Sequence, residues 1–583
     1  MTQPVQLDKE LLLSVMKPAR YIGGEVGCAQ KDFSKADVRV CLAFPDIYEI
    51  GMSHLGMRIL YDVVNKQSWC IADRVFSPWA DMEEKLKALE IPLFGLESRM
   101  PLKAFDILGF SLQYELSYAN VLNILALSGI PLESRQRDGG WPLVIAGGVC
   151  CLNPEPLADF VDLFVIGEAE EAIVEILKIY RVCKKRRFDK ARMLLALSRL
   201  KGVYVPALYR GVAKDGALEP AVDKRAPRTI VKRFVRDLER STDFSYWIVP
   251  AIEIVHDRIG IEIMRGCPHG CRFCQAYASF YPLRVVRKEK VLALARRLYR
   301  MTGYEEISLL SLSSSDHPQL KEIVEALVAG FRDKGVSISL PSLRASSLVG
   351  ELSHVFATMR KTTLTFAPEA GSQRLRDVLG KKVGPEDIFD AARQAFRAGY
   401  RTLKLYFMIG LPTETEEDLR AIVSFCLAIS ALKKEVDGHP ARLNVTISNF
   451  VPKPHTPFER AAMCSIEDLS ARQEFLKKAL GHKRGLIQLK FYDPHMSWLE
   501  AVLAQGGREC GRAIAAAHAA GARFDAWSDH FNPAIWKEAL AANNIDTAFL
   551  TAGKEEFLAS PWAFIETGVP SSRKQTPPAS LVP

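Results

Sequence analysis

The chain has 583 residues, which is too long for one hydrophobic core and predicts two to four domains. About half of the residues are apolar and a quarter are charged, a balance typical of soluble globular proteins. No apolar run reaches the ~18 residues that a membrane span needs. The first twenty residues also lack the apolar stretch and cleavage site of a signal peptide. The sequence therefore predicts a cytoplasmic protein with no membrane partner.

The formal net charge of +9 is mild for this length. Much of the positive excess is local, in the run KKRR at 184–187 and in the stretch 224–240. A solvated surface is the ordinary interpretation of such runs. No RNA-binding motif accompanies them, so a nucleic-acid partner is only weakly indicated.

The first region, residues 1–208, alternates short apolar strands with amphipathic helices. Each expected strand is a short apolar run beside glycine or turn residues, at 38–44, 105–112, 143–148 and 163–168. Helical patterns lie between them, at 54–66 and 115–129. This alternation predicts a doubly wound α/β domain with a mainly parallel sheet.

A basic, poorly periodic linker is expected at 209–250, and the strand–helix alternation then resumes over 251–487. Six strands are predicted in this second region, at 259–264, 306–312, 336–344, 362–367, 402–409 and 443–451. A helical segment follows each of them. Six βα units are fewer than the eight of a closed barrel, so we expect an open, partial β/α barrel. The last region, 488–583, is predicted to be mixed and mostly helical with a disordered end.

Three of the twelve cysteines lie within eight positions, in the segment Cys267-Pro-His-Gly-Cys271-Arg-Phe-Cys274. This segment directly follows the first strand of the expected barrel, so it lies at the end where barrel active sites are found. Three thiolates on a tight loop can bind three corners of a cubane [4Fe–4S] cluster. The fourth iron then has no protein ligand and can accept a small molecule.

Structural zinc, with His269 as the fourth ligand, is the alternative for this loop. Zinc sites favour pairs of ligands that come from two separated pieces of chain. His269 is two residues from each neighbouring cysteine, where binding the same ion would be strained. The spacing therefore favours the cluster.

CxxxCxxC with an aromatic residue before the last cysteine resembles the signature of the radical S-adenosylmethionine (radical SAM) superfamily, with Phe273 as the aromatic residue. The resemblance covers about residues 250–480. It implies that S-adenosylmethionine binds the open iron and is cleaved reductively to a 5′-deoxyadenosyl radical. It also implies a reductant such as flavodoxin or ferredoxin. The expected fold is thus α/β: an N-terminal Rossmann-like domain, a partial (β/α)6 radical SAM barrel and a mostly helical tail.

Further positions at strand ends resemble cofactor-binding positions of this superfamily. Ser314 lies in a Ser-Ser-Ser-Asp316 segment that replaces the usual Gly-Gly-Glu, and a helix cap is an equal reading there. Arg344 ends the third strand and would face the cofactor carboxylate or the substrate. Glu369 is expected to hold the ribose hydroxyls. Ile409 and Gly410 begin a Gly-Leu-Pro-x-Glu-Thr segment whose backbone would meet the adenine.

A Rossmann-like domain before such a barrel resembles the cobalamin-binding group of radical SAM proteins. Gly147 and Gly148 end a strand and would let a ligand approach the backbone, and 161–170 resembles the group's last strand and G-E-x-E loop. The D-x-H-x-x-G motif of histidine-ligated cobalamin is missing, and His54 is better read as a helix-start residue. Cobalamin without a histidine ligand and a domain that only shapes the active site both remain open.

The sequence leaves three hypotheses about function open, and it identifies a substrate for none of them. The first is a radical SAM enzyme that uses cobalamin to methylate or rearrange an unactivated carbon. The second is a cobalamin-independent enzyme that modifies RNA or protein, as methylthiotransferases do, although Cys28, Cys41 and Cys70 do not match the cysteine spacing of that family. The third is a non-enzymatic binding module that a metal stabilises.

Overall fold

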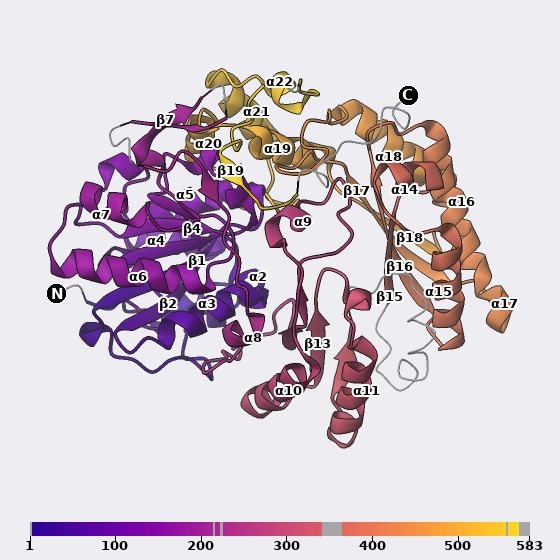
Figure 1. The fold of residues 1–583 in the computed structure, drawn as a ribbon, viewed down its shortest axis with the longest axis horizontal. Coiled ribbons are helices and arrows are strands. Elements are labelled where there is room, and N and C mark those ends of the chain that lie inside the picture. The colour runs from indigo at the N-terminus through magenta and orange to yellow at the C-terminus, as the bar shows by residue number, and fades with distance from the viewer. Residues whose placement is uncertain (1–2, 214–215, 222–225, 341–363, 556–557, 571–583) are drawn as a thin grey trace. The chain divides into compact units, whose positions relative to one another are not determined.

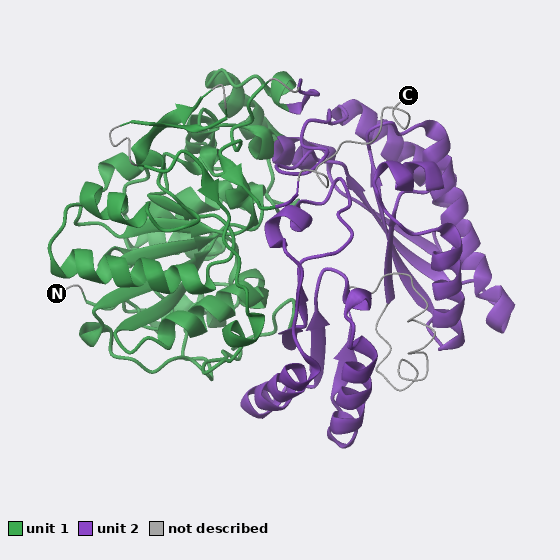
Figure 2. Ribbon diagram, viewed as in Figure 1, with its two compact units in different colours: residues 1–257, 502–550, 556–568 green, residues 258–501, 551–555, 569–583 purple. Residues whose placement is uncertain are grey.

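The chain forms two compact units in the computed structural model, which describes residues 3–213, 216–221, 226–340, 364–555 and 558–570. Unit 1 comprises Met1–Asp257, Val502–Leu550 and Glu556–Gly568, and unit 2 comprises Arg258–Ala501, Thr551–Glu555 and Val569–Pro583 (Figure 2). The expected disordered end, 571–583, lies outside the described residues. None of the helices in the described ranges is long and apolar enough to cross a membrane.

Unit 1 is built on a six-stranded sheet with the order β2-β1-β3-β4-β5-β6 (Figure 1). All neighbours in it are parallel except β5 and β6. Its strands are β1 (Val38–Phe44), β2 (Cys70–Phe76), β3 (Ile107–Ser111), β4 (Leu143–Gly147), β5 (Leu163–Val165) and β6 (Val203–Tyr204). The smaller strands are β7 (Tyr209–Val212), β8 (Leu218–Pro220), β9 (Ile230–Val231) and β19 (Ile565–Glu566).

Helices flank this sheet, as expected for a doubly wound domain. They are α1 (Lys9–Leu13), α2 (Tyr48–Ser53), α3 (Leu55–Asn65), α4 (Ala80–Ala88), α5 (Tyr118–Leu127), α6 (Glu170–Lys185), α7 (Lys190–Leu197) and α8 (Leu238–Ser241). Helices α3 and α6 lie against each other, and so do α4 and α5. Alternate residues of the strands, such as Val38, Val40 and Leu42, share one buried core with α3 and α6.

Strand β2 was not among the predicted strands, because Asp73 and Arg74 interrupt its apolar pattern. Both side chains are buried and partnered inside unit 1. The Arg74 guanidinium pairs with Glu25 at 2.9 Å and with Glu97 at 2.7 Å. Ser98 donates to the Asp73 carboxylate through its backbone N–H at 2.9 Å and through its hydroxyl at 2.6 Å. These contacts let a charged strand occupy the edge of the sheet.

Most of the C-terminal region packs within unit 1. Its helices are α20 (Cys510–Ala519), α21 (Pro533–Ala542) and α22 (Thr547–Thr551), and α20 lies against α5. The Trp527 indole donates to Asp46 Oδ1 at 3.0 Å and its ring lies 5.6 Å from that of Trp79. Asn153 Nδ2 donates to the carbonyl oxygens of Ala504 and Gly506 at 2.9 and 2.8 Å. The tail therefore covers loops that follow the strands of the first sheet.

Unit 2 contains a three-stranded sheet, β10-β13-β14, and a four-stranded sheet, β15-β16-β17-β18, and all their neighbouring strands are parallel. Their strands are β10 (Ile259–Glu262), β13 (Glu306–Leu310), β14 (Ser337–Ser339), β15 (Leu364–Glu369), β16 (Thr402–Ile409), β17 (Arg442–Asn449) and β18 (Ile487–Phe491). A short antiparallel pair is formed by β11 (Met264–Arg265) and β12 (Arg284–Val285). The predicted α/β class is confirmed, and β18 adds a strand beyond the six that were expected.

The helices of unit 2 follow the strands in turn. They are α9 (Gln275–Phe280), α10 (Lys288–Thr302), α11 (Leu320–Phe331), α14 (Gln373–Val378), α15 (Pro385–Arg397), α16 (Glu416–Leu432), α17 (Lys434–Asp437), α18 (Ile466–Leu480) and α19 (Pro494–Gln505). Helices α15, α16 and α18 lie on one side of the four-stranded sheet (Figure 1). All the loops that follow its parallel strands therefore meet at one edge, where a site can form.

Candidate functional site

The cysteine loop, residues 266–274, runs from the end of β11 to the start of α9. Gly266 opens it at φ +93°, and a Cβ at this position would lie 2.9 Å from the Phe280 carbonyl oxygen, so only glycine fits there. Cys267, Cys271 and Cys274 are all partly exposed. Burial raises the pKa of the Cys274 thiol to about 11, and the nearby thiols of Cys271 and Cys267 raise it further. Both other cysteines of the loop thus lie near enough to Cys274 to affect its thiol electrostatically.

Arg272 and Phe273 fasten the loop to the region where β15 and β16 end. Arg272 Nη1 donates to the carbonyl oxygens of Asp377 and Val378 at 2.9 and 2.7 Å, and its backbone N–H donates to Leu379 O at 2.9 Å. Phe273 packs against a buried apolar cluster of residues from the loops and helices after β15, β16 and β17: Ala370, Leu375, Val378, Leu379, Leu411, Phe450 and Phe458. Phe273 therefore anchors the loop.

His269 pairs with a carboxylate. Its Nε2 atom lies 2.6 Å from Asp316 Oδ2, in the loop that follows β13. In the described part of the chain, no three His, Cys, Asp or Glu side chains are placed to share one metal ion. The zinc alternative needs such a group, whereas a cubane binds each thiolate at a separate iron.

Ser314 is fully buried, and its hydroxyl lies 2.9 Å from that of Ser311. The neighbouring Ser313 hydroxyl donates to Asp316 Oδ2 at 2.5 Å. The serine-rich loop, residues 311–316, is thus held largely by hydrogen bonds within itself. It contacts the cysteine loop through Asp316. Arg344 lies outside the described residues.

Glu369 ends β15 in the left-handed conformation, at φ +68°. Its carboxylate pairs with Lys381 Nζ at 3.1 Å, and both side chains are about 15% exposed. Burial raises the pKa of Glu369, and the Lys381 ammonium opposes that rise. A non-glycine residue in this conformation carries strain that the surrounding structure must balance, a feature that clusters at functional sites.

Ile409 ends β16 fully buried, and Gly410 follows it at φ +73°. A Cβ at Gly410 would lie 2.7 Å from Leu469 Cδ2, so a side chain here would displace Leu469 of α18 as well as adopt the positive φ. The Gly410 N–H donates to Glu414 Oε1 at 2.9 Å, and Arg472 pairs with the same oxygen at 3.0 Å. Burial raises the pKa of Glu414 to about 7. The sequence segment therefore forms a compact, internally bonded turn.

Two polar partnerships of this edge were not predicted. One is the pair of Asp316 and His269, and the other is the pair of Lys381 and Glu369. Each pair joins two different loops. Asp316 lies in a segment that the sequence singled out, but its partner depends on the fold. Lys381 stands outside every motif, so no sequence signal marked it.

Gly147 and Gly148, at the end of β4 in unit 1, differ in what surrounds them. A Cβ at Gly148 would lie 2.2 Å from Leu112 O and 2.7 Å from Gln113 Nε2, and its φ is +119°. A Cβ at Gly147 would meet nothing nearer than Val165, at 3.9 Å. The glycine requirement at 148 therefore comes from the neighbouring loop of the same chain.

Other ligand-like features of unit 1 are also occupied by the chain. Val235 N–H donates to Glu168 Oε2 at 2.7 Å, and a Cβ at Gly167 would lie 2.2 Å from Arg233 O. His54 is the N-cap of α3, where its Nδ1 accepts from Met57 N–H at 3.3 Å. Burial lowers the pKa of His54 to about 4. The prediction that His54 starts a helix is confirmed.

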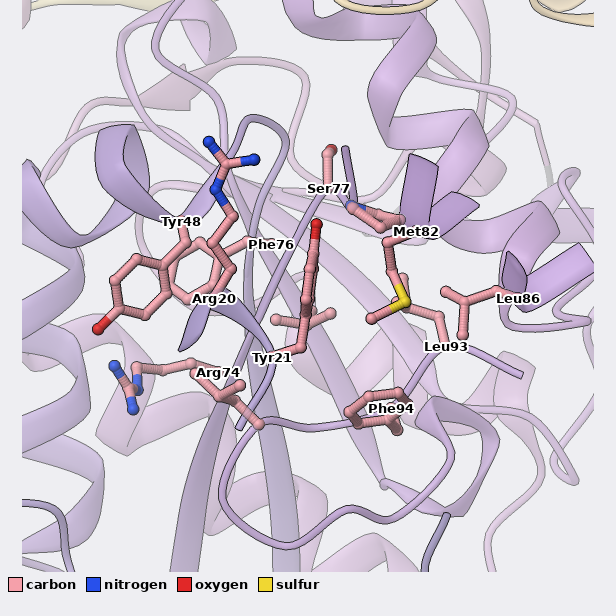
Figure 3. A pocket seen from close by; sticks show the side chains of 13 residues that line it. Arg20, Tyr21, Tyr48, Arg74, Phe76, Ser77, Met82, Leu86, Leu93 and Phe94 are labelled. Atoms are coloured by element: carbon pink, nitrogen blue, oxygen red, sulfur yellow. The ribbon is translucent and has the colours of Figure 1, made fainter. Parts of the chain in front are cut away.

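A small cavity in unit 1 lies beside the edge strand β2 (Figure 3). Its lining is mostly apolar and includes Tyr21, Phe76, Met82 and Leu86. Two buried polar atoms at its wall, Arg20 Nη1 and Ser77 Oγ, have no hydrogen-bond partner among the described residues. Its volume of about 30 Å³ suits one or two water molecules. It contains none of the predicted site residues.

The sequence matches two families of known proteins. Residues 56–206 match the family described as radical SAM proteins, N-terminal, and residues 261–426 match the radical SAM superfamily. The second match contains the cysteine loop and the loops after β13, β15 and β16. The chain belongs to the radical SAM superfamily.

Individual relatives of this radical SAM protein share modest identity with it. An uncharacterized protein of Methanocaldococcus jannaschii is 28% identical over 80% of this chain and 88% of its own length. An uncharacterized methyltransferase of Pyrococcus horikoshii is 28% identical over 31% of this chain and 40% of its own length. Among solved structures, the radical SAM methyltransferase TsrM of Kitasatospora setae, with cobalamin and a [4Fe–4S] cluster bound, aligns over 70% of this chain and 72% of its own. That alignment has a TM-score of 0.49 and 14% identity.

Proposed function

We propose that the chain cleaves S-adenosylmethionine reductively, through a [4Fe–4S] cluster held by Cys267, Cys271 and Cys274. The observation that carries this proposal is the position of the three-cysteine loop. Its Phe273 packs against residues of the loops that follow β15 and β16. The donor set fits the group, because three thiolates on one loop leave one iron of a cubane without a protein ligand.

When bound, the cluster supplies one electron to the sulfonium of S-adenosylmethionine, which gives methionine and a 5′-deoxyadenosyl radical. The residues of the chain hold and orient the reactants. Glu369 presents a carboxylate that suits the ribose hydroxyls, and the Lys381 ammonium opposes the rise in its pKa that burial causes. The turn at Gly410, fixed by Glu414, is the proposed contact for the adenine.

The electron must come from a one-electron donor, and a flavodoxin or ferredoxin is the partner class that we propose. The step after radical formation acts on an unidentified substrate. Methyl transfer is the first candidate for this step, and the name of the Pyrococcus horikoshii relative supports it. Rearrangement of the substrate is the other candidate.

Anaerobic reconstitution with iron and sulfide, followed by reduction with S-adenosylmethionine present, tests the cleavage. Mass spectrometry should detect 5′-deoxyadenosine and methionine in equal amounts. The variant Cys271→Ala should release neither, because it lacks one of the three thiolates. A wild-type protein that holds a full cluster and releases no 5′-deoxyadenosine would favour the binding-module alternative.

Cobalamin is a separate question, because its ligands would come from unit 1. The described residues offer it no cobalt ligand: His54 caps a helix, and Glu168 accepts a hydrogen bond from Val235. We therefore propose cofactor cleavage that does not depend on a corrinoid. Gel filtration after incubation with hydroxocobalamin should leave far less than one cobalt per chain, and stoichiometric cobalt would contradict this.

The methylthiotransferase-like alternative needs a second cluster in the N-terminal region. Cys28, Cys41 and Cys70 are buried there, and burial raises the pKa of each thiol. All three lie in the core, whereas the cysteines of the loop at 266–274 are partly exposed. About four iron atoms per chain, rather than about eight, would count against this alternative.

A further inference from the structure

The hydrogen bond between His269 and Asp316 connects two loops that follow different strands of unit 2. His269 lies midway between Cys267 and Cys271, and Asp316 lies in the loop after β13. The distance from Nε2 to Oδ2 is 2.6 Å, which is short for a bond between a ring nitrogen and a carboxylate oxygen. Since a carboxylate accepts, the bond places a proton on Nε2.

Asp316 is itself held in place by a second hydrogen bond. The Ser313 hydroxyl donates to the same Oδ2 atom at 2.5 Å, and the backbone N–H of Asp316 donates to Ser313 O at 3.1 Å. The side chains of His269 and Asp316 are 21% and 28% exposed, so water screens their interaction only partly. The carboxylate thus has a fixed position from which to orient the imidazole.

Arg272 holds the same loop on the other side of Cys271. Its three hydrogen bonds go to the end of α14, at Asp377, Val378 and Leu379. The loop is therefore tied at position 269 to the three-stranded sheet and at position 272 to the four-stranded sheet. Cys271 lies between these two attachments, so its sulfur position depends on both.

We propose that His269 and Asp316 are positioning residues for the iron–sulfur site. They fix the cysteine loop relative to the loop after β13. Both contacts, from His269 and from Ser313, are made by the same oxygen of Asp316, Oδ2. The inference rests on the proposed function, because it assigns the pair a role in presenting the cluster to S-adenosylmethionine.

The test compares His269→Ala, Asp316→Ala, the double variant and Asp316→Asn, each reconstituted anaerobically as the full chain. Asparagine retains an oxygen that accepts from both His269 and Ser313, so it serves as the conservative rescue. His495→Ala is the matched control, since His495 pairs with Asp493 at 3.5 Å in unit 2, at the start of α19. The measurements are iron content, the reduction potential, the paramagnetic resonance spectrum with and without S-adenosylmethionine, and KM against kcat.

We expect each alanine variant to keep about four irons, because all three cysteines remain. The KM for S-adenosylmethionine should rise roughly tenfold, the scale of one lost charge-assisted hydrogen bond. The double variant should be no worse than either single variant, because both remove the same interaction. Asp316→Asn should recover most of the affinity, and the reduction potential and the spectral change on cofactor addition should follow the same order.

Unchanged KM, potential and spectra in both alanine variants would overturn the inference, as would effects that simply add in the double variant. The reduction potential and the paramagnetic resonance spectrum can be measured without catalytic turnover, so the test does not depend on activity alone. A wild-type protein without a cluster, or without cofactor cleavage, would instead refute the proposed function and this inference together. An active wild type with unaffected variants would refute the positioning role alone.

Discussion

The loops that follow the strands differ between the two units of this chain. In unit 2, the loops that follow the strands carry the three cysteines, the strained Glu369 and the His269–Asp316 pair. In unit 1, the corresponding loops are occupied by other parts of the same chain. A Cβ at Gly148 would meet Leu112 O, Val235 donates to Glu168 and Trp527 donates to Asp46.

The difference shows that a shared α/β architecture does not by itself give a ligand site. The carboxyl edge of a parallel sheet is where ligands usually bind, because several loops converge there. Whether that edge binds a ligand depends on whether its polar groups still need a partner. In unit 1 the chain provides partners for these groups, whereas in unit 2 one loop carries three cysteines that are only partly buried.

The largest effect is expected from the cysteines themselves. Cys271→Ala should lower the iron content from about four to below about one atom per chain, because a cubane bound by two thiolates is not retained. Cys183→Ala, in the buried face of α6 in unit 1, is the control and should leave the iron content unchanged. Iron analysis after gel filtration checks both. Equal loss in the two variants would mean that the cysteine loop is not the site.

The glycine pair of unit 1 gives the next prediction. Gly148→Ala should destabilise the protein by about 3 kcal/mol, because the new methyl group meets Leu112 O in a backbone conformation that side chains rarely adopt. Gly147→Ala should cost about 1 kcal/mol or less, since its surroundings leave room. Chemical denaturation measures both free energies of unfolding. Similar values would show that the edge of unit 1 is more open than described.

Glu414 gives a prediction about pH. Its pKa is about 7 in the folded protein against an ordinary value of 4.5, so the folded state binds more protons between these pH values. The stability it contributes is fully present below pH 4.5 and is lost as the pH rises through 7. Glu414→Gln should remove roughly 1 to 3 kcal/mol of this pH dependence.

Denaturation at several pH values between 4.5 and 8 checks the Glu414 prediction. Glu416→Gln is the control, because Glu416 is 63% exposed on the first turn of α16. A pH dependence that is the same in wild type and Glu414→Gln would place the titration elsewhere.

The smallest predicted effect concerns Glu369. Glu369→Gln should raise the KM for S-adenosylmethionine about tenfold, which is about 1.4 kcal/mol of binding free energy, with less change in kcat. The exposed Glu386→Gln on α15 is the control. Steady-state measurement of 5′-deoxyadenosine release separates KM from kcat. A loss confined to kcat would mean that Glu369 acts on a later step than cofactor binding.

Much of the fold could be predicted from local signals. Thr415 forms a capping box with Asp418 at the start of α16, Pro385 opens α15, and Ser465 caps α18, as their sequence contexts indicate. Strand β2 was missed because the partners of Asp73 and Arg74 come from residues far along the chain. Strand β18 was missed because its outward residues are polar and its place at the sheet edge is set by β17.

The candidate site shows the same division. The cysteine spacing lies within one short segment and is readable directly. The partners of Glu369 and Asp316 are not, because Lys381 and His269 reach them only through the packing of separate loops. Gly148 and Gly410 were singled out as positions where a cofactor would approach the backbone, and both have a positive φ and a neighbour of the same chain where a Cβ would lie. The sequence indicates that glycine is needed at a position, but it does not identify the neighbouring group that would exclude a side chain.

The most direct test of the central claim uses the reduced, reconstituted protein and S-adenosylmethionine labelled with ¹⁵N in its amino group. Electron–nuclear double resonance should show hyperfine coupling between this nitrogen and the cluster, because on the proposed function the open iron would bind the methionine part of the cofactor. The coupling should be lost in Cys271→Ala. A cluster-containing wild-type protein without any ¹⁵N coupling would contradict the account.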